Sequence, residues 1–399
     1  MSAFYIARQP ILCANGETYG YELLYRSSDS NAYDPSVDGK TATSNVLFNA
    51  VVEVGMDNLV GNGLAFVNLT DDFLVSPDLL ELLPPGRCVL EVLEDVVVTD
   101  EVVAGVKQLI AKGHVMALDD FVDKEQFARL LPLAQIIKYD ITQHSMEALK
   151  AYRLEDEAAG RRSLVERVET HEEFEELCSY GFHYFQGYFF AKPKVISGSK
   201  LPANRVALVQ LMAEINNPDS TIQELAEIVE REVSLGVRTL RYINSPLNGL
   251  RVEVTSIHHA AVMLGRDMIS NWVTLLVMSQ MDDRPTEVIK LALTRARFCQ
   301  KVAERNSLNS AKYFTFGLLS LLDVFMGQSM QDALSSVAVS EDLQDELVNR
   351  TGEGGLMLNL IECFETGSAV DAEGAEEIEL GQLYQSAVAW SEETSGLLN

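Results

Sequence analysis

The first half of the chain alternates short, apolar, β-rich runs with stretches of helical periodicity, and this alternation ends near residue 195. The pattern predicts an α/β domain with parallel strands, because each parallel pair needs a crossover that is usually helical. We expect eight strands, near residues 4–11, 17–26, 64–69, 88–93, 114–119, 136–141, 163–168 and 184–190. The first two lie close enough to form a hairpin that turns at Asn15-Gly16.

Eight strands with intervening helices predict a (β/α)8-like barrel of the TIM type over residues 1–195, although this length is short for such a barrel. An open, doubly wound parallel sheet is the competing topology. Helical patterns lie between the later strands, for example over residues 44–53 and 101–110.

The second half of the chain shows helical periodicity without strand signals. Pro, Gly and Ser interrupt the pattern after residue 191, so we place a linker at 196–202 and an all-α domain at 203–399. Thr221 and Glu224 have the spacing of a capping box at the start of one of the predicted helices.

Acidic residues outnumber basic residues by 59 to 31, which gives the chain a formal net charge of −28. This charge argues against a nucleic-acid polymer as a partner, because such binding depends on cations that displace the counterions of the phosphates. A bound anion therefore needs a local device, such as a metal ion or a well-placed arginine.

The five cysteines are widely spaced and form no C-x-x-C pair, which fits reduced thiols better than a disulfide framework. The N-terminus lacks the apolar run of a signal peptide, and no stretch of about 18 uncharged apolar residues occurs later. We therefore expect a soluble, cytoplasmic protein without a membrane partner.

Polar side chains, most of them acidic, occur at or near the ends of successive predicted strands. In a (β/α)8 barrel these ends meet at one mouth, where functional side chains gather. Crowded carboxylates repel one another, so we expect cations among them, and oxygen ligands favour Mg²⁺, Mn²⁺ or Ca²⁺. Capping of the next helix or simple solvation is the alternative for any single residue. The residues are Glu22, Asn68, Glu91, Glu94, Asp119, Asp120, Lys138, Glu166, Glu169 and Gln186.

Eight motifs of the first half resemble, in sequence order, those of the EAL family. They are Gln9-Pro10-Ile11, Glu22-Leu23-Leu24-Tyr25-Arg26, Val67-Asn68-Leu69-Thr70, Leu90-Glu91-x-x-Glu94, Asp119-Asp120-Phe121, Ile137-Lys138-Tyr139-Asp140, Val168-Glu169-Thr170 and Gln186-Gly187-Tyr188-x-x-x-Lys192-Pro193. The resemblance covers residues 1–195. It implies a (β/α)8-type barrel that hydrolyses the bacterial second messenger cyclic di-GMP with two divalent metal ions.

The resemblance also implies a role for each matching position. The metal ligands or their close supports would be Glu22, Asn68, Glu91, Asp119 and Asp120, with Mg²⁺ or Mn²⁺ as the ions. The catalytic residues would be Lys138, which orients the attacking water, and Glu166, which also counts among the metal ligands or supports. The substrate contacts would be Arg26 as a phosphate clamp, Glu169 and Gln186, while Glu94 would anchor a positioning loop.

The chain departs from the EAL pattern in three places. The signature Glu-Ala-Leu reads Glu22-Leu23-Leu24, and Ala-Glu-Gly-Val-Glu-Thr reads Val165-Glu166-Arg167-Val168-Glu169-Thr170. The family follows its aspartate pair with Phe-Gly-Thr-Gly and a loop of small residues, whereas here Phe121 leads into Val122–Phe127, which reads as a helix start. In active relatives that loop positions metal and substrate and contributes to the dimer contact.

The helical half resembles the HDOD domain, a degenerate relative of the HD phosphohydrolases. The matching segments are Glu224–Val229, Leu240–Pro246, Ile257–Gly265 and Phe316–Leu319. Metal-dependent HD hydrolysis needs a His-Asp dipeptide, whereas residues 200–399 contain only the adjacent His258 and His259, which cannot both chelate one ion well from a helix. We therefore expect a regulatory domain that binds a protein partner.

Together these features predict a signalling protein of the cyclic di-GMP pathway. Its barrel would retain the metal ligands but lack the positioning loop, and so act as a sensor or scaffold with weak or no hydrolysis, coupled to an HDOD output domain. The alternative is an active metal-dependent phosphodiesterase that produces pGpG. The expected partners are cyclic di-GMP, a protein bound through the HDOD domain and, as a homodimer, a second copy of the chain.

Overall fold

The structure, a computed structural model, describes residues 4–27, 55–69, 71–75, 80, 83–122, 125–192, 203–216, 220–231, 233–245, 254–278, 286–337, 339–368 and 375–398. The predicted helix at 44–53 and the predicted linker at 196–202 lie outside these residues. Two compact units make up the chain: Met1–Lys192 with Glu362–Gln385, and Pro193–Ile361 with Ser386–Asn399.

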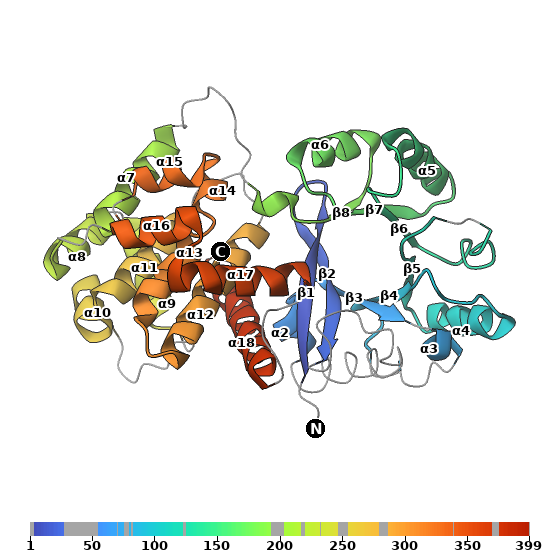
Figure 1. Ribbon diagram of the computed structural model, residues 1–399, viewed down its shortest axis with the longest axis horizontal. Helices are drawn as coiled ribbons and strands as arrows, with labels where there is room; N and C mark the ends of the chain where they lie inside the picture. The colour runs from blue at the N-terminus through green and yellow to red at the C-terminus, as the bar shows by residue number, and fades with distance from the viewer. Residues whose placement is uncertain are drawn as a thin grey trace. The chain divides into compact units, whose positions relative to one another are not determined.

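In the first unit, eight strands close into a barrel in chain order (Figure 1). β1 (Phe4–Cys13) runs antiparallel to both of its neighbours, β2 and β8, and the other neighbouring pairs are parallel. The remaining strands are β2 (Thr18–Ser27), β3 (Leu64–Leu69), β4 (Cys88–Val92), β5 (Val115–Leu118), β6 (Ile136–Asp140), β7 (Arg162–Glu166) and β8 (Tyr184–Gln186). The predicted barrel is therefore confirmed, and the open sheet is excluded.

Helices of the barrel unit follow the strands as the alternation predicts. α4 (Asp100–Ala111) confirms the helix expected at 101–110, and the side chain of Thr99 caps it by accepting a hydrogen bond from the Val102 N–H. The others are α2 (Met56–Val60), α3 (Asp71–Val75), α5 (Met146–Ala158), α6 (His171–Tyr180) and the 3₁₀ turn η3 (Phe189–Ala191).

The connection between β5 and β6 corrects one expectation. The helix start predicted at Val122–Phe127 is wrong, because residues 125–133 form successive turns. Pro132 lies in this stretch, and proline disfavours helical backbone at the residue before it and cannot donate a helical hydrogen bond. In addition, the Gln126 side chain donates a 2.6 Å hydrogen bond to the Glu94 carbonyl, which ties the segment to the connection after β4.

Helices joined by short turns and irregular segments make up the rest of the described chain, as the periodicity predicts. They are α7 (Ala203–Asn216), α8 (Ile222–Arg231), α9 (Val233–Ile243), α10 (Ile257–Leu264), α11 (Arg266–Met278), α12 (Thr286–Arg305), α13 (Ser310–Leu319), α14 (Leu322–Met326), α15 (Met330–Ser335), α16 (Glu341–Asn349), α17 (Gly352–Thr366) and α18 (Ala375–Leu398). The capping box before α8 is present, because Thr221 Oγ1 accepts from the Glu224 N–H and the Glu224 side chain accepts from the Thr221 N–H. None of the described helices is both long and apolar enough to cross a membrane.

The segment Glu362–Gln385 belongs with the barrel unit, whereas the sequence places all of 203–399 in one helical domain. The Gln9 side chain of β1 donates a 3.0 Å hydrogen bond to the Thr366 carbonyl, and the Tyr188 hydroxyl donates one of 3.0 Å to Glu365 Oε2. Helical periodicity identifies the buried face of a helix but not what that face packs against, so this assignment needed the structure.

Candidate active site

One layer of side chains inside the barrel contains most of the predicted site residues. Below it lies an apolar layer that includes Phe66, Val89, Ala117, Ile136, Leu164 and Tyr184. Each of six predicted residues comes two positions after one of these apolar residues, on the same strand or just past its end. Because successive residues of a strand alternate between its two faces, all six side chains point into the barrel interior, as the apolar ones do. The six residues are Asn68, Glu91, Asp119, Lys138, Glu166 and Gln186.

Lys138 lies at the centre of this layer with its side chain fully buried. Its Nζ is 2.8 Å from Glu91 Oε1, 2.7 Å from Asp119 Oδ1, 2.7 Å from Glu166 Oε1 and 3.7 Å from Glu22 Oε2. We call these four carboxylates and Lys138 the inner cluster. Sequence-distant positions on β2, β4, β6 and β7 and after β5 are thus brought to one buried point.

Two amides hold Glu22 in place. Asn68 Nδ2 donates to Glu22 Oε1 at 3.0 Å, and Gln186 Nε2 donates to Glu22 Oε2 at 2.6 Å. Burial raises the pKa of Glu22, but Lys138 and these hydrogen bonds outweigh that effect, so its pKa lies below the ordinary value. Glu22 is therefore an ionised carboxylate with a fixed orientation.

Gln9 also belongs to the site, although the sequence did not single it out as a site residue. Its Oε1 accepts a 2.9 Å hydrogen bond from Gln186 Nε2. The strand pattern could have identified Gln9, because it lies two positions before Ile11, a residue of the apolar layer. Since β1 runs antiparallel to its neighbours, the residue two positions earlier on β1 lies in the same layer as the residue two positions later on the other strands.

The inner cluster has more negative than positive charge. Burial raises the pKa of Glu166 to about 8; Lys138 opposes this shift, whereas Asp119 and Glu22 add to it. Burial also raises the pKa of Glu91 well above its ordinary value against the opposing effect of Lys138. Burial lowers the pKa of Lys138, but the four carboxylates outweigh this effect and raise the pKa above its ordinary value, so the ammonium stays charged.

Asp120 and Asp140 form a second acidic group, which we call the outer pair. Burial raises the pKa of Asp120 to about 6, and repulsion from Asp119, Glu94 and Asp140 adds to the shift. Arg167 NH1 lies 2.9 Å from Asp140 Oδ2, and Asp140 also accepts a 2.8 Å hydrogen bond from the Thr142 N–H.

Three predicted residues remain, of which Glu94 and Glu169 belong to neither group. Glu94 and Glu169 are exposed, and Glu169 Oε2 instead pairs with Lys192 Nζ at 3.2 Å. Arg26 lies on β2 opposite Tyr5, but its side chain is outside the described residues.

The donor set of the inner cluster suits a hard divalent cation. Its side chains offer carboxylate oxygens, and Glu91 Oε2 is buried without a hydrogen-bond partner among the described residues. In the present arrangement the oxygens surround the Lys138 ammonium, and no three acidic, histidine or cysteine side chains in the described ranges have the geometry of a metal site. The residues therefore fit Mg²⁺ or Mn²⁺ by their chemistry.

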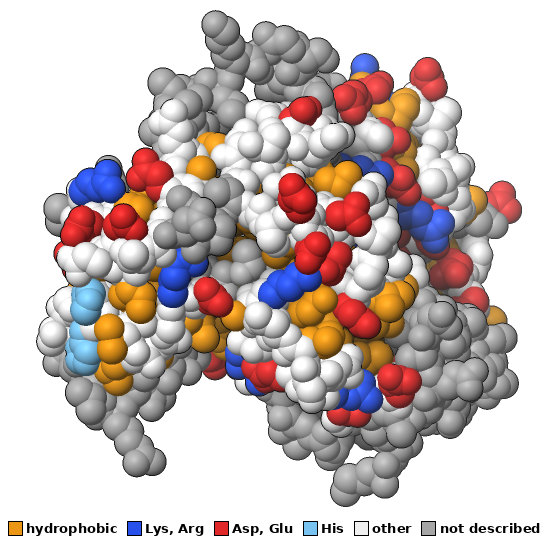
Figure 2. Space-filling model, turned by 60° about the vertical axis from the view of Figure 1, so that its left-hand side comes forward, with side chains coloured by type: hydrophobic (Ala, Val, Ile, Leu, Met, Phe, Trp, Pro, Cys, Tyr) orange, Lys and Arg blue, Asp and Glu red, His pale blue; other side chains and the backbone are white. Residues whose placement is uncertain are grey.

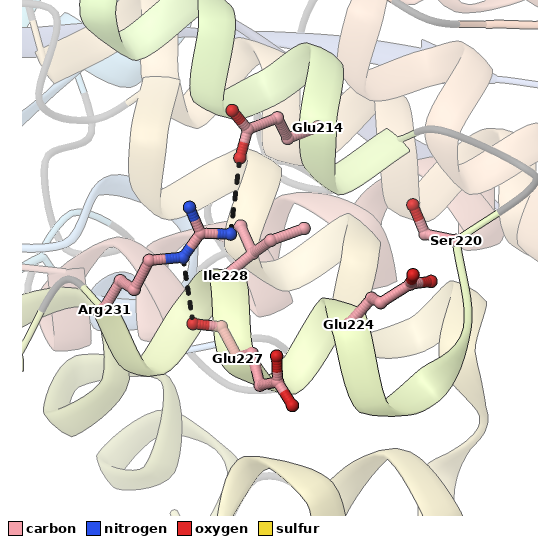
Figure 3. Close-up of a pocket in the computed structure, with 6 residues that line it drawn as sticks. All are labelled: Glu214, Ser220, Glu224, Glu227, Ile228 and Arg231. Atoms are coloured by element: carbon pink, nitrogen blue, oxygen red, sulfur yellow. Dashed lines mark hydrogen bonds and ion pairs between the residues drawn. The ribbon is translucent and has the colours of Figure 1, made fainter.

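The helical unit contains a hollow of about 250 Å³, and none of the residues that line it belongs to the candidate active site (Figure 3). It is lined by Glu214, Ser220, Glu224, Glu227, Ile228 and Arg231. Arg231 lies 3.8 Å from Glu214 with both side chains mostly exposed, which is the geometry of a solvated surface pair. Acidic side chains are likewise dispersed over the face seen in Figure 2.

Comparison with known proteins agrees with these two units. Residues 2–193 match the EAL domain model and residues 201–351 match the HDOD domain model. The chain is 32% identical over 412 residues to the cyclic di-GMP phosphodiesterase CdgJ of Vibrio cholerae, covering 100% of this chain and 94% of CdgJ. It is 29% identical over 412 residues to the uncharacterized protein YuxH of Bacillus subtilis, covering 97% of each.

Among solved structures, an EAL domain protein from Listeria monocytogenes EGD-e aligns with 19% identity and a TM-score of 0.41, over 47% of this chain and 87% of that chain. The full-length match to CdgJ and the two consecutive domain matches together define the relationship. This chain belongs to the family of proteins in which an EAL domain is followed by an HDOD domain.

Proposed function

We propose that the barrel is a metal-dependent phosphodiesterase that hydrolyses cyclic di-GMP to linear pGpG. The observation that carries this proposal is the convergence of Glu22, Glu91, Asp119 and Glu166 from separate strands on one buried point. Such an excess of carboxylates in a buried site is typical of sites that bind divalent cations. The activity named for CdgJ, which matches this chain over its full length, supports the same reading.

The metal ligands would be Glu22, Asn68, Glu91, Asp119 and Asp120, whose oxygen donors suit Mg²⁺ or Mn²⁺. When bound, divalent ions would lower the pKa of a coordinated water and stabilise the charge that develops on the phosphate. Arg26 and Glu169 are the proposed substrate contacts at the mouth, and Gln186 fixes the carboxylate of Glu22.

In the proposed reaction a water oxygen attacks one phosphorus, the bond from phosphorus to the ribose 3′ oxygen breaks, and that oxygen takes up the proton that Glu166 has received from the water. The Lys138 Nζ would donate a hydrogen bond to the attacking oxygen and so fix its position. Glu166 would accept the proton of the water in its ionised form, which becomes the major form above its raised pKa of about 8 and which a nearby divalent cation would favour.

A second candidate function is a sensor that binds cyclic di-GMP with weak or no hydrolysis. The connection between β5 and β6 favours it, because Val122 is exposed there and residues 125–133 form turns in place of the family's small-residue loop. Displacements of about 1 Å in a catalytic site can lower a rate on the order of 100-fold. In either case the HDOD domain would bind a protein partner, and a homodimer remains part of the proposal.

A turnover assay on the purified full chain separates the two. Wild type, Glu22→Ala and the surface control Glu172→Gln would be incubated with cyclic di-GMP and Mg²⁺ or Mn²⁺, and pGpG would be measured by anion-exchange chromatography. We expect wild type and the control to form pGpG at equal rates, and Glu22→Ala to lose about 100-fold or more. Nucleotide binding without pGpG formation supports the sensor. Absence of both nucleotide binding and pGpG formation overturns both candidate functions.

A further inference from the structure

Arg167 has an unusual backbone conformation for its residue type. Its φ is 58°, in the left-handed region that side chains other than glycine, asparagine and aspartate rarely adopt. The EAL motif has glycine at this position, so Arg167 places a charged side chain where the backbone conformation favours glycine.

The conformation of Arg167 is held from both sides. The Ile141 N–H donates to the Glu166 carbonyl at 3.3 Å, and the Val168 N–H donates to the Gln186 carbonyl at 3.0 Å. The end of β8 also lies close to this segment, because a Cβ atom on Gly187 would be only 2.1 Å from the Val168 carbonyl oxygen. The backbone therefore presents Arg167 at a fixed place beside the end of β7.

The side chain of Arg167 is directed to the outer pair. Its NH1 lies 2.9 Å from Asp140 Oδ2, and Asp140 is buried while the Arg167 side chain is 62% exposed. Asp120 Oδ1 is buried without a hydrogen-bond partner among the described residues. Burial and neighbouring carboxylates raise the pKa of Asp120, and Arg167 is the cation that acts against them.

Among the described residues, each acidic group of the mouth thus has one cation paired with it. Lys138 neutralises part of the inner cluster, and Arg167 neutralises part of the outer pair. A divalent ion that approaches the outer pair meets the repulsion of the guanidinium as well as the attraction of the carboxylates.

We propose that Arg167 is a built-in cation of the barrel mouth that competes with a divalent metal ion for Asp120 and Asp140. The inference rests on the proposed metal-dependent function and deepens it. It predicts that the wild-type chain binds fewer divalent ions, or binds one of them more weakly, than its carboxylates alone would allow.

The test is a titration of the full chain with Mn²⁺, followed by electron paramagnetic resonance of free Mn²⁺ and by calorimetry. Arg167→Gly removes the charge and suits the backbone, while Arg167→Lys keeps the charge. Arg350→Gly is the matched control, because Arg350 has a φ of 55° at the end of α16 and is far from the motif in sequence. Glu22→Ala reports on metal binding by the inner cluster.

We expect Arg167→Gly to bind one additional Mn²⁺, or to bind Mn²⁺ at least about tenfold more tightly. The reason is that the substitution removes a repulsive charge within hydrogen-bond distance of the Asp140 carboxylate. Arg167→Lys and Arg350→Gly should match wild type. If Arg167→Gly equals wild type in stoichiometry and affinity, the inference is overturned, whether or not wild type binds Mn²⁺. Failure of the proposed metal site is a separate result, in which Glu22→Ala and wild type bind Mn²⁺ alike.

Discussion

Lys138 Nζ lies 2.8 Å from Glu91 Oε1, and neither side chain is exposed to solvent. A buried ion pair adds little net stability, because desolvation of both charges offsets their attraction, but loss of one partner leaves an uncompensated buried charge. Glu91 has no other cation among the ion pairs of the described residues, so loss of Lys138 would leave this carboxyl group without a counter-charge.

Replacement of Lys138 should therefore destabilise the barrel strongly. We expect Lys138→Met to lower the free energy of unfolding by about 3–5 kcal/mol in EDTA, and Mn²⁺ to restore part of the loss by supplying positive charge. Urea unfolding followed by circular dichroism measures both. Lys301→Met is the control, since Lys301 pairs with Glu304 at the surface and should change stability by less than about 1 kcal/mol. Equal stability of Lys138→Met and wild type in EDTA would contradict the assigned ion pairs.

Glu166 makes stability depend on pH. Its pKa of about 8 in the folded chain exceeds the ordinary 4.5, so the folded state holds a proton that the unfolded state has released. The free energy of unfolding should fall as pH rises from about 4.5 to about 8, by up to about 1.4 kcal/mol per pH unit from this group. In EDTA between pH 5 and 8, Glu166→Gln should show a shallower slope than wild type. Parallel slopes would show that Glu166 is ionised throughout.

Tyr188 ties the segment Glu362–Gln385 to the barrel. Its hydroxyl donates a 3.0 Å hydrogen bond to Glu365, which is only 6% exposed. Because hydrogen bonds to buried charged groups stabilise by roughly 1.5–3 kcal/mol, Tyr188→Phe should lower the free energy of unfolding by about that amount. Tyr180→Phe removes a comparable hydrogen bond to Glu176 at the surface and should have almost no effect. Urea unfolding that gives equal losses for the two variants would refute the buried contact.

Gly187 allows the close approach of β8 to the chain after β7. Alanine there would combine a φ of 146° with a Cβ atom 2.1 Å from the Val168 carbonyl oxygen, so the strand end that bears Gln186 must move. Gly160 has a φ of 72° and no atom within 4 Å of an added Cβ. Gly160→Ala should therefore cost about 1 kcal/mol, and Gly187→Ala at least 2 kcal/mol more by the same thermal or urea measurement. A similar cost for both would mean that the backbones can separate freely.

The strand pattern made much of the barrel and its site predictable. The period of two that buries Phe66, Val89 and Ile136 also places Asn68, Glu91 and Lys138 in one inward layer, so strand ends alone identified these residues.

Other features depend on contacts between distant segments and could not be read from the sequence. The turns at 125–133 depend on Pro132 and on the hydrogen bond from Gln126 to Glu94, and both override the local helical pattern. The membership of Glu362–Gln385 in the barrel unit depends on Gln9 and Tyr188, which lie more than 170 residues away. The central place of Lys138 among four carboxylates depends on closure of the barrel.

The most direct test of the account is a crystal structure of the full chain soaked with Mn²⁺, with data collected at the manganese absorption edge. The account predicts an anomalous peak within ligand distance of Glu22, Asn68, Glu91 and Asp119, with Lys138 displaced from the centre of these carboxylates. A barrel mouth without an anomalous peak at saturating Mn²⁺, in which Lys138 still contacts Glu91, Asp119 and Glu166, would contradict the proposed metal-dependent phosphodiesterase.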